Sequence, residues 1–206
     1  MGYIFYALNN SANCAGMAPP ALPGGAFGLA ALPAGMAMAG TYIIVNTATN
    51  NRYIGIATNI HNRFQTRLAT VTEMGFSPAV LANIGVTWGI AHCRNTLPAL
   101  PALPAPPVPP PPPLLQPVAG SFPVAPVAGA PYTAVIDGAV INLEHLLIRF
   151  VMSQLGGGGT VSNNLMVAPY ANPTANPITV SLQWGAMGGL FAANTMQAIW
   201  GPGVAW

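Results

Sequence analysis

A run of prolines divides this chain into two parts. Residues 97–131 read LPALPALPAPPVPPPPPLLQPVAGSFPVAPVAGAP. Because proline lacks a backbone N–H and fixes φ, such a stretch is excluded from helix interiors and from the middle of a sheet, and it favours polyproline II. We interpret the segment as a stiff linker or an insertion between two halves of one domain. A proline-rich ligand for an aromatic groove is the alternative.

Scarcity of charge is the second constraint. Charged residues make up 4% of the 206-residue chain, against roughly 25% in an ordinary soluble domain. Residues 1–51, 95–136 and 150–206 contain no charged side chain. The formal net charge of +2 is too small for the broad basic surface that dominates nucleic-acid affinity, so any contact with nucleic acid should be local.

The apolar composition does not predict a membrane span, because proline or glycine interrupts every long uncharged stretch. The N-terminal MGYIFYALNNSANC has no basic region before its apolar run, which argues against a secretory signal peptide. The expected location is the cytoplasm, or the outside of the cell by a non-classical export route, and the sequence leaves this choice open. It also leaves open whether Cys14 and Cys93 pair.

The clearest local signals lie in residues 40–67. TYIIVNT and RYIGIAT are rich in β-branched and aromatic residues and are separated by ATNN, which predicts a hairpin. Apolar residues at helical spacing, beginning with Ile60 and Phe64, predict a helix after it. Arg63 and Arg67 lie one turn apart on this helix, beside its apolar stripe. Further on, VTWGIAHC is compatible with a third strand.

A second helix is predicted after the prolines, in DGAVINLEHLLIRFVMSQLGGGG. Its polar stripe consists of Asn142, His145 and Arg149, and it places Glu144 among apolar side chains. A carboxylate on the apolar side of a helix requires a reason, which makes Glu144 a candidate functional residue. Near the C-terminal end, ITVSLQW alternates like a strand and GLFAANTMQAIW predicts a weak apolar helix.

Taken together, these motifs resemble the GIY-YIG nuclease family. GTYII is followed by RYIG, with Tyr53 eleven positions after Tyr42, and Arg63 follows ten positions later. LEHLLIR and the later SNN resemble the family's glutamate helix and its asparagine. The resemblance covers residues 40–94 and 140–164.

The resemblance implies a fold and a domain organisation. The expected fold class is α/β, with a small core made of a three-stranded antiparallel sheet flanked by helices, and with uncharged arms rich in proline, glycine and alanine. The expected organisation is an N-terminal arm at 1–39, a GIY-YIG-like domain at 40–165 that the proline-rich segment interrupts, and an uncharged C-terminal extension at 166–206.

The resemblance also implies a catalytic site. Tyr42 would act as a base or position the attacking water, and Tyr53 would contact the water or the phosphate. Arg63 would stabilise developing negative charge. Arg67 stands where the family most often has histidine, and because an arginine cannot act as a general acid near neutral pH it would serve as a phosphate clamp. Glu144 would bind a divalent cation, Mg²⁺ or Mn²⁺. The residues expected to support this site are Gly55, Asn163 and Asn164.

Two functions follow from these observations. The first is a metal-dependent endonuclease that cleaves DNA or RNA, in the manner of an effector or toxin. The second is a self-assembling structural protein, the subunit of a filament, shell or tube, built on a degenerate nuclease-like scaffold. The second is favoured by the charge-free residues 1–51 and 150–206, because burial between copies in a homo-oligomer removes the need for a charged surface.

Overall fold

The structure is a computed structural model that describes residues 2–13, 34–70, 83–95, 120–129, 132–155, 160–184 and 195–206. Most of the proline-rich segment, Cys14 and the glycine run at 156–159 lie outside the described residues. Within the first helix, the side chains of residues 65 and 67–70 also lie outside this description. The predictions made for these parts are therefore not tested by the structure.

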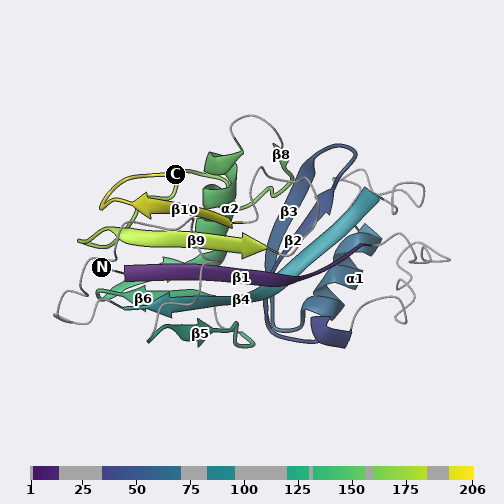
Figure 1. Cartoon of the computed structure of the whole chain (residues 1–206), viewed down its shortest axis with the longest axis horizontal. Coiled ribbons are helices and arrows are strands. Elements are labelled where there is room, and N and C mark those ends of the chain that lie inside the picture. Colours follow the sequence, from purple (N-terminus) through teal and green to yellow (C-terminus); the bar gives the residue numbers. More distant parts are fainter. Residues whose placement is uncertain are drawn as a thin grey trace, which may run out of the picture.

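The described chain is dominated by strands (Figure 1). Its elements are, in order, β1 (Gly2–Asn13), η2 (Ala34–Met36), β2 (Gly40–Asn46), β3 (Asn51–Ala57), α1 (Ile60–Thr70), β4 (Ile84–Arg94), β5 (Phe122–Val124), β6 (Thr133–Ile136), β7 (Ala139–Asn142), α2 (Leu143–Gln154), β8 (Thr160–Val161), β9 (Ile178–Trp184) and β10 (Thr195–Trp200). An 8-stranded sheet has the order β10-β9-β1-β4-β2-β3-β8, with β5 paired to β4, and β6 and β7 form a separate 2-stranded sheet.

The predicted fold class was wrong, because the sheet is a large mixed one rather than a three-stranded antiparallel core with arms. β1 comes from the predicted N-terminal arm and lies between β4 and β9, parallel to β9. β9 and β10 come from the predicted C-terminal extension and continue the sheet. Gly2–Leu8 is continuously buried. A strand that is covered on both faces does not show the alternation of apolar and polar residues that a half-exposed strand shows.

The predicted hairpin and the helix after it are present. β2 pairs with β3 antiparallel, with Tyr42 opposite Gly55, and β4 pairs with the other side of β2. Arg52 is buried within the hairpin and donates hydrogen bonds to the backbone oxygen and the side-chain oxygen of Asn50, at 2.8 and 2.9 Å. Asn50 has φ 58°, a left-handed turn conformation that asparagine tolerates. Burial lowers the pKa of Arg52, and its two hydrogen bonds to Asn50 fix the hairpin turn.

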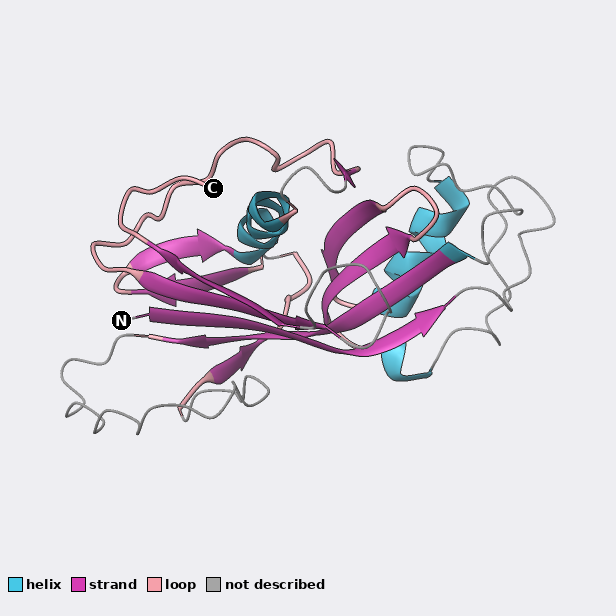
Figure 2. Ribbon diagram, turned by 45° about the horizontal axis from the view of Figure 1, so that its top comes forward, coloured by secondary structure: helices cyan, strands magenta, loops and turns pink. Residues whose placement is uncertain are grey.

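α1 and α2 pack against opposite faces of the hairpin. Tyr42, Ile44 and Tyr53 belong to one buried cluster, with Ile60 and Phe64 of α1. On the other face, a second cluster joins residues of β2 and β3 to α2. Its members in these elements are Ile43, Val45, Ile54, Leu143, Leu146, Leu147, Ile148, Phe150 and Val151. In Figure 2 the sheet curves, and the two helices lie against different parts of it.

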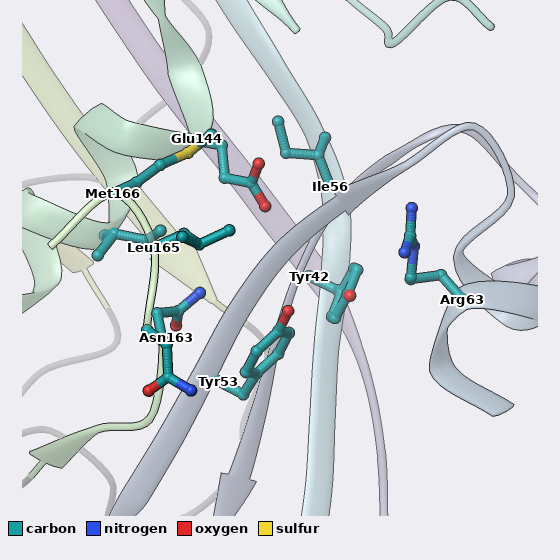
Figure 3. A pocket seen from close by; sticks show the side chains of 10 residues that line it. Tyr42, Tyr53, Ile56, Arg63, Glu144, Asn163, Leu165 and Met166 are labelled. Atoms are coloured by element: carbon teal, nitrogen blue, oxygen red, sulfur yellow. The ribbon is translucent and has the colours of Figure 1, made fainter. Parts of the chain in front are cut away.

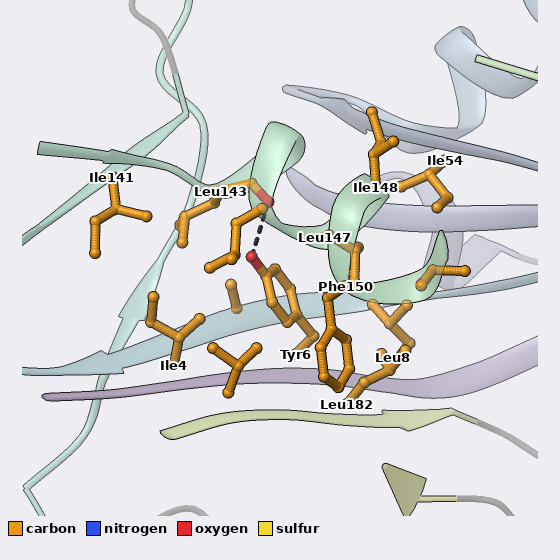
Figure 4. Packing of buried hydrophobic residues seen from close by; sticks show 14 of the residues in the cluster. Ile4, Tyr6, Leu8, Ile54, Ile141, Leu143, Leu147, Ile148, Phe150 and Leu182 are labelled. Carbon is orange, nitrogen blue, oxygen red and sulfur yellow. Dashed lines mark hydrogen bonds between the residues drawn. The ribbon is translucent and has the colours of Figure 1, made fainter. Parts of the chain in front are cut away.

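The cluster around α2 also fixes the start of that helix (Figure 4). The Tyr6 hydroxyl of β1 donates a hydrogen bond of 2.8 Å to the backbone oxygen of Leu143. Desolvation raises the pKa of Tyr6 well above its ordinary value, so the hydroxyl stays protonated and able to donate. Leu8, Phe150 and Leu182 are buried in the same cluster, which joins β1 and β9 to the helix.

The helix predicted around Glu144 is present as α2 (Leu143–Gln154), but parts of two predicted helical segments are strands. α2 begins at Leu143, and the residues before it form the β6–β7 hairpin. Asp137 and Gly138 have φ 51° and 77°, as a tight hairpin turn of the Asp-Gly type requires. Residues 195–200 form β10 rather than a weak helix, because they pair antiparallel with β9. Tertiary pairing therefore overrides a weak helical pattern.

No helix among the described residues is both long and apolar enough to cross a membrane.

Candidate functional site

A pocket of about 320 Å³ lies at the outer edge of β3, between the two helices (Figure 3). Side chains from β2, β3, α1, α2 and the segment after β8 line it. The lining residues are Tyr42, Tyr53, Ile56, Arg63, Glu144, Ile148, Asn163, Asn164, Leu165 and Met166.

The pocket exists because β8 leaves β3 early. β8 pairs with β3 only at Asn51 and Arg52, and the N–H of Ser162 donates to the oxygen of Arg52 at 2.7 Å. The next pair of hydrogen bonds to β3 is made by a side chain. The Asn163 amide accepts from the N–H of Ile54 at 3.0 Å and donates to the oxygen of Ile54 at 2.7 Å. This amide replaces one pair of backbone hydrogen bonds to β3, and beyond it, at Ile56, no strand of the described residues pairs with this side of β3, which leaves an open edge.

One face of the sheet contributes the tyrosines and the arginine. Tyr42 and Tyr53 are buried, with ring centroids 6.4 Å apart and an interplanar angle of 29°. Gly55 makes room for the first ring, since a Cβ at this position would lie 2.4 Å from the Tyr42 hydroxyl oxygen. The Tyr42 side chain can therefore cross β3 toward its open edge. Arg63 is exposed on α1 and lines the same pocket.

The other face contributes Glu144, in the first turn of α2. Asn142 caps this helix by accepting from the N–H of His145 at 2.9 Å. The Tyr170 hydroxyl accepts from the N–H of Asn142 at 2.9 Å, and its ring stacks on His145 with centroids 4.4 Å apart. Nε2 of His145 donates to the oxygen of Ala168 at 2.9 Å. These contacts fix the turn that carries Glu144.

The structure brings most of the sequence-predicted site residues together at one pocket, although they come from opposite faces of the sheet. Arg67 is in α1, but its side chain lies outside the described residues. Gly55 lies under the Tyr42 ring. The predicted residues that line the pocket are Tyr42, Tyr53, Arg63, Glu144, Asn163 and Asn164. Their catalytic roles stay predictions.

Sequence reasoning missed the apolar part of the pocket. Ile56 and Ile148 extend from β3 and α2, and Leu165 and Met166 follow the asparagines. Ile56 and Ile148 fit ordinary strand and helix patterns, and two apolar residues in an irregular segment carry no periodic signal. The exposure of Leu165, at 78%, is visible only in three dimensions.

The pocket residues fit a divalent cation that binds together with its substrate. Within the described part of the chain, no group of three or more His, Cys, Asp or Glu side chains could hold a metal ion. Mg²⁺ is commonly held by only one or two carboxylates, together with substrate phosphates and retained waters. Glu144 supplies one carboxylate in the pocket, so the donor set fits a substrate-bound cation better than a permanently coordinated one.

Comparisons of the chain with protein-family models, with curated proteins and with solved structures gave no match. The resemblance to GIY-YIG nucleases therefore rests on the motifs in the chain itself.

Replacement of Asn163 by alanine should destabilise the open edge. Asn163→Ala removes two hydrogen bonds to the Ile54 backbone, and we expect the free energy of unfolding to fall by roughly 1–3 kcal/mol. Urea denaturation followed by tryptophan fluorescence measures the change. Asn164→Ala, at the exposed neighbouring position, is the matched control and should cost less. Equal losses for the two variants would contradict the role given to Asn163.

Proposed function

We propose that this protein is a divalent-metal-dependent phosphodiesterase that cleaves DNA or RNA in the pocket at the β3 edge. The observation that supports the proposal is the meeting, in one pocket, of a carboxylate, an arginine and two tyrosines from four separate elements. These side chains are Tyr42 of β2, Tyr53 of β3, Arg63 of α1 and Glu144 of α2. Phosphodiester hydrolysis uses these groups to orient water and to stabilise charge on the phosphate.

Each residue has a role that its chemistry allows. The hydroxyls of Tyr42 and Tyr53 both donate and accept hydrogen bonds, so they can orient a water or a phosphate oxygen. Arg63 carries a fixed positive charge and stabilises the negative charge that develops on the phosphate. Glu144 would hold Mg²⁺ or Mn²⁺. When bound, the cation would lower the pKa of a coordinated water and polarise the phosphate.

The side chains would reach the phosphate from two opposite faces of the sheet. The tyrosines and Arg63 approach the phosphate from the α1 side, whereas Glu144 approaches it from the α2 side. A phosphate at the open edge would be contacted from both sides at once. This is the positioning that in-line attack at phosphorus needs.

Glu144→Gln should abolish metal-dependent cleavage, because the amide keeps the shape of the side chain and loses the charge that holds the cation. Arg63→Ala should lower kcat by about 10²–10³-fold, the effect of removing one preorganised contact to a charged transition state. Cleavage of single-stranded DNA, duplex DNA and RNA is measured with Mg²⁺ and with Mn²⁺.

The control is Asp137→Asn, which removes a carboxylate in the β6–β7 turn, at a residue that does not line the pocket. Asparagine also tolerates the left-handed backbone at this position. This variant should cleave like the wild type. A wild-type protein that cleaves none of the three substrates with either metal would contradict the proposal.

We propose self-assembly as a second function on the same scaffold. Among the described residues, β10 is the last strand of the sheet. Its residue Ile199 is 65% exposed, and residues 195–206 contain no charged side chain. Natural edge strands are commonly protected from pairing by charges or proline. This edge therefore suits antiparallel pairing with a second copy of the chain.

Sedimentation velocity at micromolar concentrations tests this second function. The wild type should sediment as an oligomer, and Ile199→Lys should shift it toward the monomer because it places a charge on the edge. A wild-type protein that sediments as a monomer at tens of micromolar would exclude assembly through this strand.

A further inference from the structure

The pocket at the β3 edge has a polar side and an apolar side. Figure 3 shows Leu165 and Met166 on the opposite side of the pocket from Tyr42 and Arg63. Ile56 and Ile148 also line the pocket. Catalysis at a phosphate uses the polar groups and gives the apolar residues no role.

The segment that carries Leu165 and Met166 is held in place on both sides. Asn163 binds the backbone of Ile54 before it. After it, the oxygen of Val167 accepts from Nη1 of Arg149 at 2.7 Å, and the oxygen of Ala168 accepts from His145. A fixed segment that presents apolar side chains to solvent is typical of a binding surface.

The backbone supports the same interpretation. Met166 has φ 61°, in the left-handed region that a residue other than glycine seldom adopts. Such a conformation persists where the surrounding structure imposes it, and it is common at ligand-binding segments. Leu165 is 78% exposed and Met166 36% exposed, so both can contact a ligand without unfolding.

The charges at the pocket are too few for binding through phosphates alone. The side chains that line it include one arginine and one glutamate, whose charges cancel. A protein that grips a duplex by its backbone uses six or more phosphate contacts and shows a steep dependence on salt. With Arg63 as the basic residue lining this pocket, binding needs another source of affinity, and packing of a nucleobase against apolar side chains can supply it.

The size of the pocket favours a single nucleotide. A volume of about 320 Å³ is at the lower end of the range for small-molecule sites. A base that is stacked and paired in a duplex cannot place its face against the apolar side, because that face is covered by its neighbours. The base must therefore be unpaired, or extruded from the stack, before it enters.

We propose that the pocket binds one unpaired nucleotide, with its phosphate toward Arg63 and its base against the side formed by Leu165 and Met166, so that the substrate is a single-stranded nucleic acid. The fate of the phosphodiester bond after binding rests on the proposed function, whereas binding itself does not require cleavage.

Fluorescence anisotropy with labelled ten-nucleotide oligomers tests this proposal. Oligo-dT, oligo-rU and a ten-base-pair DNA duplex are titrated with wild-type protein, with EDTA and in parallel with Ca²⁺. At least one single strand should bind tenfold or more tighter than the duplex. The slope of log K against log[salt] should lie between about −0.7 and −1.4, the values for one and two phosphate contacts on a single strand.

Two variants separate the two sides of the pocket. Leu165→Asn should weaken single-strand binding by about tenfold and leave the salt slope unchanged, because it alters the contact with the base. Arg63→Gln should make the slope shallower by about 0.7, because it removes one phosphate contact. Val135→Asn makes the same type of change at an exposed residue of β6 that does not line the pocket and should bind like the wild type.

Equal binding of duplex and single strand, a slope steeper than about −4, wild-type binding by Leu165→Asn or no binding under either condition would each overturn the proposal. Single-strand binding without cleavage would leave it standing and remove the proposed function. Cleavage of duplex DNA by a protein that binds duplex and single strand equally would overturn the binding proposal and leave the proposed function standing.

Discussion

The two hydrogen bonds between the Asn163 amide and the backbone of Ile54 determine where the sheet ends at its β3 side. β8 supplies only two paired residues, and a backbone that continued alongside β3 would cover Ile56. The side chain satisfies both polar groups of Ile54 and lets the chain turn away at the same point. The edge beyond Ile54 therefore stays open while the polar groups before it are paired.

An open edge is the place where groups from both faces of a sheet can meet. Alternate residues of β2 and β3 pack against α1 on one face and α2 on the other, so a side chain in the middle of either face could not reach the other. At the edge, Tyr42 crosses over Gly55 from one face and Glu144 projects from the other. The pocket thus depends on a small residue at 55 and on an early end to β8.

Local signals predicted most of the polar residues that line the pocket and little of the fold. The β-branched runs around ATNN predicted the hairpin, and Ile60 and Phe64 predicted the helix that carries Arg63. The position of β1 between β4 and β9 could not be predicted, because a strand buried on both faces has no alternating pattern and its partners are distant in sequence. The dipeptide Asp137–Gly138 indicates a hairpin turn, and the prediction of a helix over this segment did not take it into account. The exposed Leu165 carried no signal, since exposure depends on tertiary structure.

Anomalous scattering from crystals soaked in Mn²⁺ together with a nucleoside 5′-phosphate tests most directly the central claim, that the β3 edge is a metal-assisted phosphodiester site. The account predicts an anomalous peak beside the Glu144 carboxylate, on the side that faces Tyr42 and Arg63, and no such peak in crystals of Glu144→Gln. A wild-type crystal at millimolar Mn²⁺ with no peak in this pocket, or with peaks only elsewhere, would contradict it.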